Sequence, residues 1–185
     1  LLLEVRREAL APAALDHAAL AGSRTGVFAG LATQDFARRV PEAAIDRHFG
    51  VGTSPAVASG RIAYLLDLRG PTLTLDTACS SSLVAVHYAM RALRDGECDL
   101  ALAGGVSLML SPALSESFAS AGMLAPDGRC KSFDAAADGY GRGEGAGVVV
   151  LKRLSEALRD GEPVHAVLRG SAVNQVGRIA GVTAP

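Results

Sequence analysis

The 185-residue sequence has no tryptophan, and aromatic side chains make up only 4% of it. Its core must therefore consist mainly of Ala, Val and Leu, and its 21 glycines allow backbones to approach closely, as in layered α/β folds. The only lysines are Lys131 and Lys152 and the formal net charge is −1, which excludes a polybasic nucleic-acid-binding protein. Fractions of 49% apolar and 20% charged residues exclude a disordered or collagen-like chain.

Cysteine is scarce too, with only Cys79, Cys98 and Cys130. An odd number without a C-x-x-C pair argues against a disulfide framework and against a zinc site, and it favours a reducing, cytoplasmic environment. The sequence shows no signal-peptide pattern. Its longest stretch without charged residues, 100–115, is shorter than the ~18 residues of a membrane-spanning helix, so we predict no membrane span.

Hydrophobic periodicity predicts helices that alternate with short apolar strands. The predicted helices cover residues 1–21, 59–66, 80–95 and 154–160, and the predicted strands cover residues 25–31, 72–76, 99–104, 145–152 and 164–169. Loops and short helices are predicted between residues 35 and 60. This alternation indicates a layered α/β fold with a mainly parallel sheet.

The segment with the clearest chemistry surrounds Cys79. A predicted strand ends at Asp76, a tight turn follows, and a long helix begins near Ser80. A thiol at the N-terminus of a helix faces the positive end of the helix dipole, which favours the thiolate. The pattern is that of a nucleophile elbow with Cys in place of Ser, although the same pattern also permits an inert, buried cysteine. Cys98 and Cys130 have no such context.

A thiolate nucleophile usually has a basic partner, and no histidine suits this role. His87 follows Cys79 by eight residues on the same predicted helix, which places it roughly 12 Å away. His17, His48 and His165 give no pattern that links them to the cysteine. The glycine-rich run 139–147 is not a phosphate-binding loop, because it precedes a strand and fits neither G-x-G-x-x-G nor G-K-[ST].

Four segments carry a family resemblance: GSRTGVFAG at 22–30, GRIAYLLDLRGP at 60–71, GPTLTLDTACSSSLVAVHYAMRALRDGECDLALAGGVSLMLSP at 70–112, and APDGRCKSFDAAADGYGRGEGAGVVVLKRL at 125–154. In this order they resemble the ketosynthase (β-ketoacyl synthase) domain of modular type I polyketide synthases, and the resemblance runs from end to end. It implies a thiolase-like five-layer αβαβα fold. Residues 1–185 would form a partial domain, truncated at both ends, with most of the N-terminal half and the entry to the C-terminal half.

The resemblance also implies an activity, decarboxylative Claisen condensation. Cys79 matches the cysteine that takes an acyl chain from the phosphopantetheine arm of an acyl carrier protein, and its backbone N–H would contribute to the oxyanion hole. Phe133 matches a phenylalanine near the reaction centre and is a candidate pocket wall. The family's two catalytic histidines lie in motifs that this sequence does not contain, so we expect these residues alone to be inactive.

Further expectations concern partners and cofactors. The resemblance implies a homodimer that works with acyl carrier protein, acyltransferase and other domains of one synthase and binds no cofactor directly. The composition predicts no nucleic-acid partner and no membrane span. Val176, Ile179 and Ala180 replace residues that are often polar in the family, which leaves the substrate class and modular or iterative use open. Two alternatives also remain open: a non-elongating gatekeeping or dimerisation domain, and a cysteine acyl-thioester hydrolase.

Overall fold

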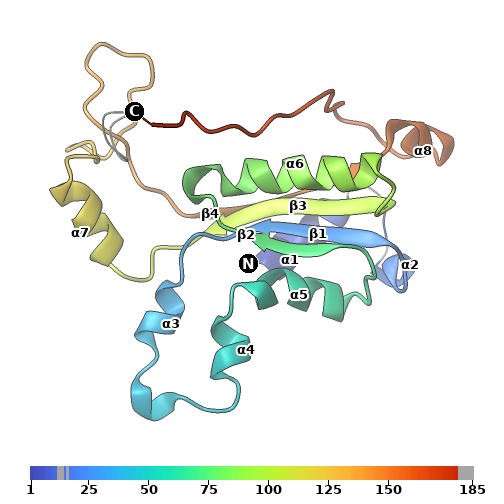
Figure 1. The fold of residues 1–185 in the computed structure, drawn as a ribbon, viewed down its shortest axis with the longest axis horizontal. Helices are drawn as coiled ribbons and strands as arrows, with labels where there is room; N and C mark the ends of the chain where they lie inside the picture. Colours follow the sequence, from blue (N-terminus) through green and yellow to red (C-terminus); the bar gives the residue numbers. More distant parts are fainter. Residues whose placement is uncertain (12–14, 16, 179–185) are drawn as a thin grey trace.

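A single four-stranded sheet organises the chain (Figure 1). The computed structural model describes residues 1–11, 15 and 17–178. The strands are β1 (Thr25–Gly30), β2 (Thr72–Leu75), β3 (Leu100–Ser107) and β4 (Gly145–Lys152), in the order β2-β1-β3-β4. β1 pairs in parallel with β2 and β3, whereas β4 pairs with β3 antiparallel. The predicted mainly parallel sheet is therefore confirmed, with one antiparallel edge.

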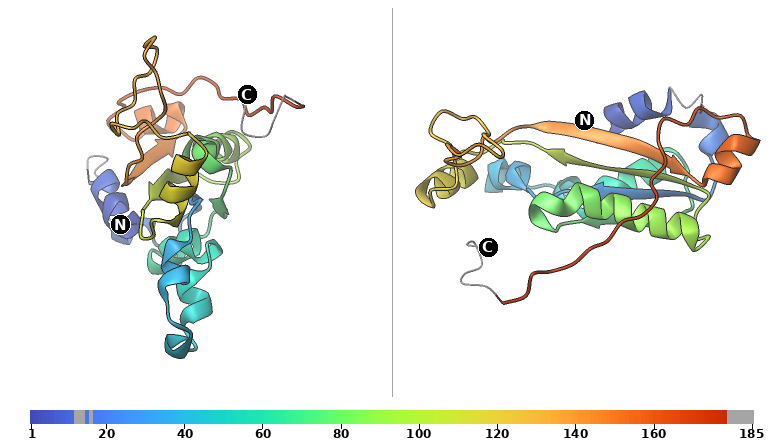
Figure 2. Two further views of the ribbon diagram at one scale, coloured as in Figure 1. Left: turned by 90° about the vertical axis from the view of Figure 1, so that its left-hand side faces the viewer. Right: turned by 90° about the horizontal axis from the view of Figure 1, so that it is seen from above.

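Helices cover both faces of the sheet, which gives three layers (Figures 1 and 2). α6 (Ser81–Arg94) packs on one face, against β1 and β3, and α1 (Leu2–Leu10) and α5 (Ala56–Leu65) pack on the other. All of β1 is buried, because it is a central strand with helices on both sides. The arrangement is an α/β fold, as predicted.

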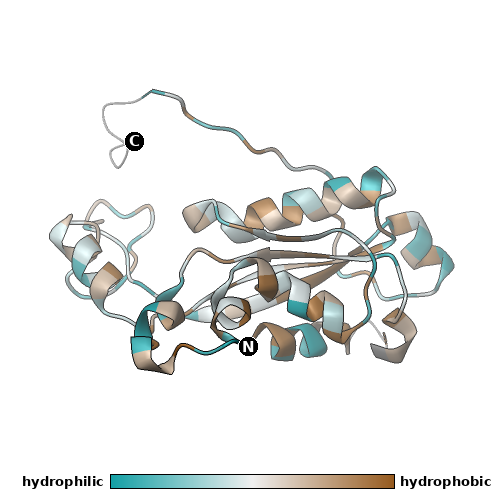
Figure 3. Ribbon diagram, turned by 60° about the horizontal axis from the view of Figure 1, so that its bottom comes forward, coloured by the Kyte–Doolittle hydropathy of each residue, from teal (hydrophilic) through white to brown (hydrophobic). Residues whose placement is uncertain are grey.

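The two faces of the sheet bury different side chains. Under α6 the core is built largely from alanine, including Ala85, Ala89 and Ala101, none of which has measurable exposure. Under α1 and α5 it is built from larger aliphatic residues such as Leu10 and Ile62. Figure 3 shows hydrophobic and hydrophilic residues alternating along α6, as expected for a helix with one buried side. Small side chains let α6 lie close to the sheet.

Short elements make the connections. They are α2 (His17–Leu20), α3 (Asp35–Arg39), η1 (Glu42–Ala44), α4 (Phe49–Thr53), η2 (Ala78–Ser80), α7 (Ala113–Ser120) and α8 (Leu154–Arg159). The short helices predicted between residues 35 and 60 are confirmed. No helix in the described part of the chain is long and apolar enough to cross a membrane.

Two predicted elements differ from the structure. The helix predicted at 1–21 is divided into α1 and α2, and residues 12–14 and 16 lie outside the described residues. The strand predicted at 164–169 is wrong, because this segment pairs with no strand among the described residues and its side chains are exposed. It runs along α6 (Figure 1), where Arg94 donates to the Arg169 carbonyl and His87 Nδ1 lies 2.8 Å from Ser171 Oγ. A short apolar run becomes a strand only where the edge of another strand lies beside it to pair with.

Candidate active site

Cys79 lies in the turn that joins β2 to α6. β2 ends at Leu75, the 3-10 turn η2 carries the cysteine, and α6 begins at Ser81. The predicted strand–turn–helix is thus present, and the Cys79 thiol is free and exposed. Since α6 is 14 residues long, its N-terminal N–H groups and dipole present a positive end close to the sulfur.

Side chains of the turn bind its own backbone. Asp76 Oδ1 accepts a hydrogen bond from the Ala78 N–H at 2.9 Å. The buried Ser81 hydroxyl donates to the Ala78 carbonyl at 2.6 Å and accepts from the Thr77 N–H at 2.9 Å. Ala78 has a φ of 54°, a left-handed conformation that is unfavourable for a residue with a Cβ. These hydrogen bonds therefore hold a backbone that alanine would not adopt unaided.

Glycines at the ends of two strands let α6 begin close to the sheet. A Cβ on Gly30, the last residue of β1, would lie 2.7 Å from Ser82 N, and one on Gly105, in β3, would lie 3.0 Å from Ser82 Cβ. Both distances are shorter than a normal carbon contact. A side chain at Gly30 would therefore displace the first turn of α6, and the cysteine with it.

A cleft of about 390 Å³ opens beside Cys79. It is bounded by the start of α6 and by the adjoining ends of β1, β3 and β4. Its lining is mostly apolar and small: Gly30, Ala32, Ala78, Cys79, Ser81, Ser82, Leu83, Val86, Ala103, Gly104, Gly105, Val106, Gly145, Ala146, Gly147 and Val149. An apolar cleft with one nucleophilic sulfur suits an acyl chain attached through a reactive carbonyl.

The other two cysteines have different surroundings. Cys98 is fully buried, and burial raises the pKa of its thiol. The Cys130 sulfur accepts the Gly141 N–H at 3.2 Å, within the loop that follows α7. Neither residue lines the cleft beside Cys79. No group of three or more His, Cys, Asp or Glu side chains among the described residues could hold a metal ion.

No histidine is hydrogen-bonded to Cys79 in the part of the chain that the structure describes. His87 bonds to Ser171 on the far side of α6, and His48 Nε2 accepts from Arg47 Nε at 3.1 Å. His165 lies in the exposed segment after α8. Among the described residues, Cys79 therefore lies at a helix N-terminus without a hydrogen-bonded basic side chain.

Phe133 is exposed and lies in the loop between α7 and β4. Its φ of 66° is also left-handed. Lys131 braces this loop by ion pairs to Asp127 at 2.9 Å and to Asp138 at 2.6 Å, and its hydrogen bond lowers the pKa of Asp127. Phe133 is not part of the cleft lining, so its assignment as a pocket wall stays a prediction.

Sequence reasoning did not identify the side chains that support the site. Asp76 and Ser81 are such residues, and the only local signal is that Asp and Ser often bond to nearby backbone at turns. Two further side-chain hydrogen bonds were not predicted either: Glu144 accepts the Met109 N–H at 2.5 Å, and Arg142 donates to Ser115 Oγ at 2.8 Å.

Of the residues that depart from the family pattern, Val176 is exposed, whereas Ile179 and Ala180 lie outside the described residues.

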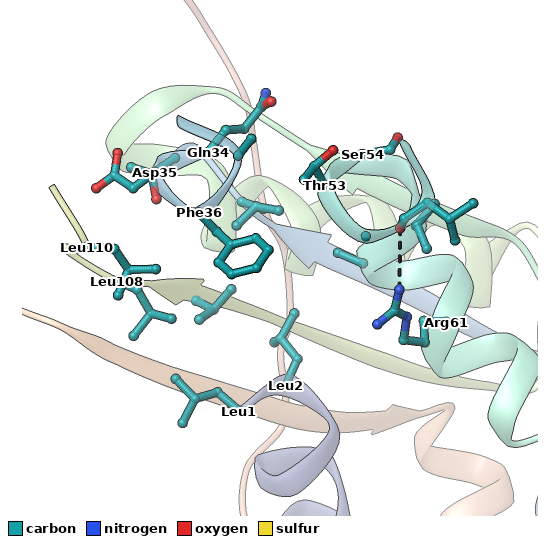
Figure 4. Close-up of a pocket in the computed structure, with 18 of the residues that line it drawn as sticks. Leu1, Leu2, Gln34, Asp35, Phe36, Thr53, Ser54, Arg61, Leu108 and Leu110 are labelled. Carbon is teal, nitrogen blue, oxygen red and sulfur yellow. Dashed lines mark hydrogen bonds between the residues drawn. The ribbon is translucent and has the colours of Figure 1, made fainter. Parts of the chain in front are cut away.

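A second cavity of about 320 Å³ lies on the other face of the sheet (Figure 4). Phe36 points into it, and Leu1, Leu2 and Leu108 lie around it. The carboxylate of Asp35, at its rim, accepts the Ser111 N–H at 3.2 Å. None of the predicted site residues lines this cavity, so the cleft at Cys79 is the candidate active site.

Comparison with known proteins decides the family. The family model "Beta-ketoacyl synthase, N-terminal domain" matches residues 1–157. The chain belongs to the β-ketoacyl synthase family. Among the ketosynthases of known structure, the chain is similar to the ketosynthase from module 6 of the bacillaene synthase from Bacillus subtilis 168, with a TM-score of 0.91 and 42% identity. That match covers 100% of this chain and 31% of the other.

Curated relatives of the family are much longer proteins. Erythronolide synthase EryA3 of Saccharopolyspora erythraea is 56% identical over 188 residues, which cover 100% of this chain and 6% of the relative. The 6-methylsalicylic acid synthase of Aspergillus niger is 52% identical over 187 residues, 100% of this chain and 10% of the relative. The chain thus spans a small part of the length of both proteins.

Proposed function

We propose that this chain forms the acyl-accepting part of a polyketide synthase ketosynthase, with Cys79 as the nucleophile. The Cys79 thiolate attacks the carbonyl carbon of an acyl thioester carried on phosphopantetheine. A new C–S bond forms as the bond to the carrier sulfur breaks, and the carrier leaves as a thiol after taking up a proton. The observation that supports this most directly is the free, exposed Cys79 at the N-terminus of α6, beside an apolar cleft.

The second step joins two acyl units. A malonyl-type extender on an acyl carrier protein loses carbon dioxide, and the resulting enolate attacks the thioester on Cys79. The new C–C bond forms, the bond to Cys79 sulfur breaks, and the thiolate is regenerated. In the family that this sequence resembles, two catalytic histidines promote this step. Neither of the motifs that contain them occurs in the present sequence. The residues present here would therefore supply acylation and substrate positioning.

Negative charge on the substrate oxygen needs stabilisation during both steps. We assign one donor to the backbone N–H of Cys79, which has no hydrogen-bond acceptor among the described residues. A donor already aimed at the developing charge is typically worth ~10²- to 10³-fold in rate. Phe133 is proposed as a wall of the complete pocket. The acyl group arrives on phosphopantetheine, so we propose no cofactor held by this chain itself.

A homodimer is proposed through the β2 edge of the sheet. Among the described residues, β2 has a strand partner on one side only. Apolar side chains on or beside it are exposed: Tyr64 and Leu65 on α5, and Leu73 on β2. We call these three residues the edge patch. Unpaired strand edges and exposed apolar groups both favour association. Carrier protein, acyltransferase and other domains of the same synthase are the further partners, in a cytoplasmic setting.

Acyl transfer to Cys79 can be tested on the full-length protein. A short acyl thioester of N-acetylcysteamine, which imitates the phosphopantetheine arm, should add one acyl group to Cys79, as seen by mass spectrometry. Cys79→Ala should abolish the adduct and reduce condensation by at least ~10³-fold, because no other residue in the cleft is a comparable nucleophile. Cys130→Ala is the matched control and should be acylated as before.

The same experiment separates the alternatives. Rapid release of free acid from Cys79 would indicate a cysteine hydrolase. A stable adduct without elongation, in the presence of malonyl carrier protein, would indicate a non-elongating gatekeeping domain. Failure of the unsubstituted protein to take up the acyl group at Cys79 would contradict the proposed function.

A further inference from the structure

We propose that Asp76 and Ser81 are positioning residues for the acylation of Cys79. They hold Ala78 in its left-handed conformation, and they thereby orient the N–H of Cys79 for the carbonyl oxygen of the incoming acyl group. This inference rests on the function proposed above. It goes beyond that function because neither side chain would touch the reacting atoms.

Other residues of the turn hold both backbone polar groups of Ala78. Its N–H donates to Asp76 Oδ1 at 2.9 Å. Its carbonyl accepts from Ser81 twice, from the backbone N–H and from Oγ at 2.6 Å. Ser81 is only 5% exposed, so water has little access to replace its hydroxyl. The φ of 54° at Ala78 is therefore set by these contacts and not by the preference of alanine.

The planarity of the peptide bond links the Ala78 carbonyl to the N–H of Cys79. The carbonyl of Ala78 and the N–H of Cys79 belong to one planar trans peptide group, in which they point in opposite directions. When Ser81 binds the carbonyl, it also sets the direction of the N–H. That N–H has no acceptor among the residues that the structure describes, and Cys79 lines the cleft. Ser81 thus controls a donor that is available to a substrate.

The direction of the Cys79 N–H matters for the chemistry of acylation. As Cys79 sulfur bonds to the acyl carbon, the carbonyl oxygen gains negative charge, and the Cys79 N–H stabilises it only if correctly aimed. Loss of the Ser81 hydroxyl leaves only the Ser81 backbone N–H on the Ala78 carbonyl, so this peptide is held less firmly, and it also leaves the Thr77 N–H without its acceptor. A misplacement of about 1 Å can cost ~10²-fold in rate. Alkylation of the same sulfur by iodoacetamide displaces iodide from a saturated carbon and develops no such oxyanion.

The two reactions give the test. In the full-length protein, we expect Ser81→Ala to slow acylation of Cys79 by an N-acetylcysteamine thioester by roughly 10- to 100-fold. The rate at which iodoacetamide alkylates Cys79 should stay within about twofold of the rate in the unsubstituted protein, because Ser81 does not set the nucleophilicity of the sulfur. The matched control is Ser120→Ala, which removes an α7 hydroxyl that donates to the Glu116 carbonyl at 2.8 Å. It should change neither rate.

Substitution of Asp76 gives a second test that leaves the core unchanged, since the Asp76 side chain is exposed. Asp76→Asn keeps an acceptor for the Ala78 N–H and should be acylated at least five times faster than Asp76→Ala, with equal alkylation rates. The proposal is overturned if Ser81→Ala is acylated as fast as the unsubstituted protein, or if acylation and alkylation fall in parallel. An unsubstituted protein that is never acylated would overturn the proposed function as well.

Discussion

Single residues determine how close α6 comes to the sheet and hence where Cys79 lies. Gly30 and Gly105 allow the close approach because they have no Cβ: backbone and Cβ atoms of the first turn of α6 occupy the space that a side chain would need. Ala78 matters because its left-handed backbone turns the chain sharply between β2 and α6. Each of these positions contributes geometry to the turn that carries Cys79, the proposed nucleophile.

Substitution of Gly30 tests this view. Gly30→Ala would place Cβ 2.7 Å from Ser82 N and 2.8 Å from the Ser81 carbonyl carbon, so the first turn of α6 must move. We expect a loss of ~1–3 kcal/mol in the opening free energy of the α6 amides, measured by hydrogen exchange in the full-length protein, together with slower acylation of Cys79.

The control for Gly30 is another glycine. Gly60 lies within α5, and a Cβ there would meet no atom within 4 Å. Gly60→Ala should be neutral or stabilising by up to ~1 kcal/mol, because alanine favours a helix over glycine. Equal effects of the two substitutions would contradict the close-approach explanation.

At the scale of elements, charged side chains join β4 to α8. Lys152, at the end of β4, bonds to Asp160 at 2.8 Å and to Glu162 at 2.7 Å. Burial opposes its charge, but the hydrogen bonds with both carboxylates outweigh this and raise the pKa of Lys152. Arg153 donates to the carbonyls of Leu93 and Cys98, which ties the same junction to the end of α6. The contacts place α8 at the end of the sheet opposite to Cys79.

Acid should loosen this junction. Hydrogen bonds from Arg159, and then from Lys152, hold the pKa of Asp160 well below its usual range. Because the pKa is lower in the folded chain than in the unfolded chain, this stabilisation is complete above about pH 4 and is lost as the pH falls toward the folded value. Asp160→Asn should therefore increase amide exchange in α8 relative to the unsubstituted protein near pH 6, with a difference that shrinks below pH 4.

A second carboxylate controls for the general effect of charge. Glu8 on α1 is exposed and has no ion-pair partner among the described side chains, so Glu8→Gln should leave the exchange of α8 unchanged. A difference between Asp160→Asn and the unsubstituted protein that stays constant from pH 6 to pH 3 would contradict the assignment.

At the scale of the whole molecule, the edge patch and the cleft lie on different parts of one sheet. The patch flanks β2, whereas the cleft extends across the ends of β1, β3 and β4. Tyr64, at 85% exposure, contributes little to the packing of its own chain. A substitution there can therefore probe association without disturbing Cys79, the proposed nucleophile.

Tyr64→Asp should weaken the proposed dimer. A charge placed in an apolar interface is desolvated without a partner, so we expect the dissociation constant to rise about tenfold or more. Sedimentation equilibrium of the full-length protein measures this. Leu158→Asp, on exposed α8 beyond the opposite edge strand β4, is the control and should leave association unchanged. An unaltered dissociation constant for Tyr64→Asp would exclude the edge patch as the interface.

Local patterns were enough to predict much of the fold. The alternating run at 72–76, the apolar run at 99–104 and the valine-rich run at 145–152 all correspond to strands, since their alternation or apolar, β-branched composition is visible in the residues of each run. The same reasoning failed at 164–169, where the segment is rich in apolar residues but no strand among the described residues pairs with it. Pairing depends on residues elsewhere in the chain, and periodicity carries no information about them.

The site divides in the same way. The sequence alone was sufficient to predict that Cys79 lies in a strand–turn–helix and to recognise the family resemblance, because both depend on residues that are neighbours in the chain. Tertiary structure alone brought Gly145 and Gly147 to Cys79, through the antiparallel pairing of β4 with β3. It also showed that Ser81 binds the Ala78 carbonyl. A hydrogen bond depends on direction and distance, and these exist only once α6 has packed against the sheet.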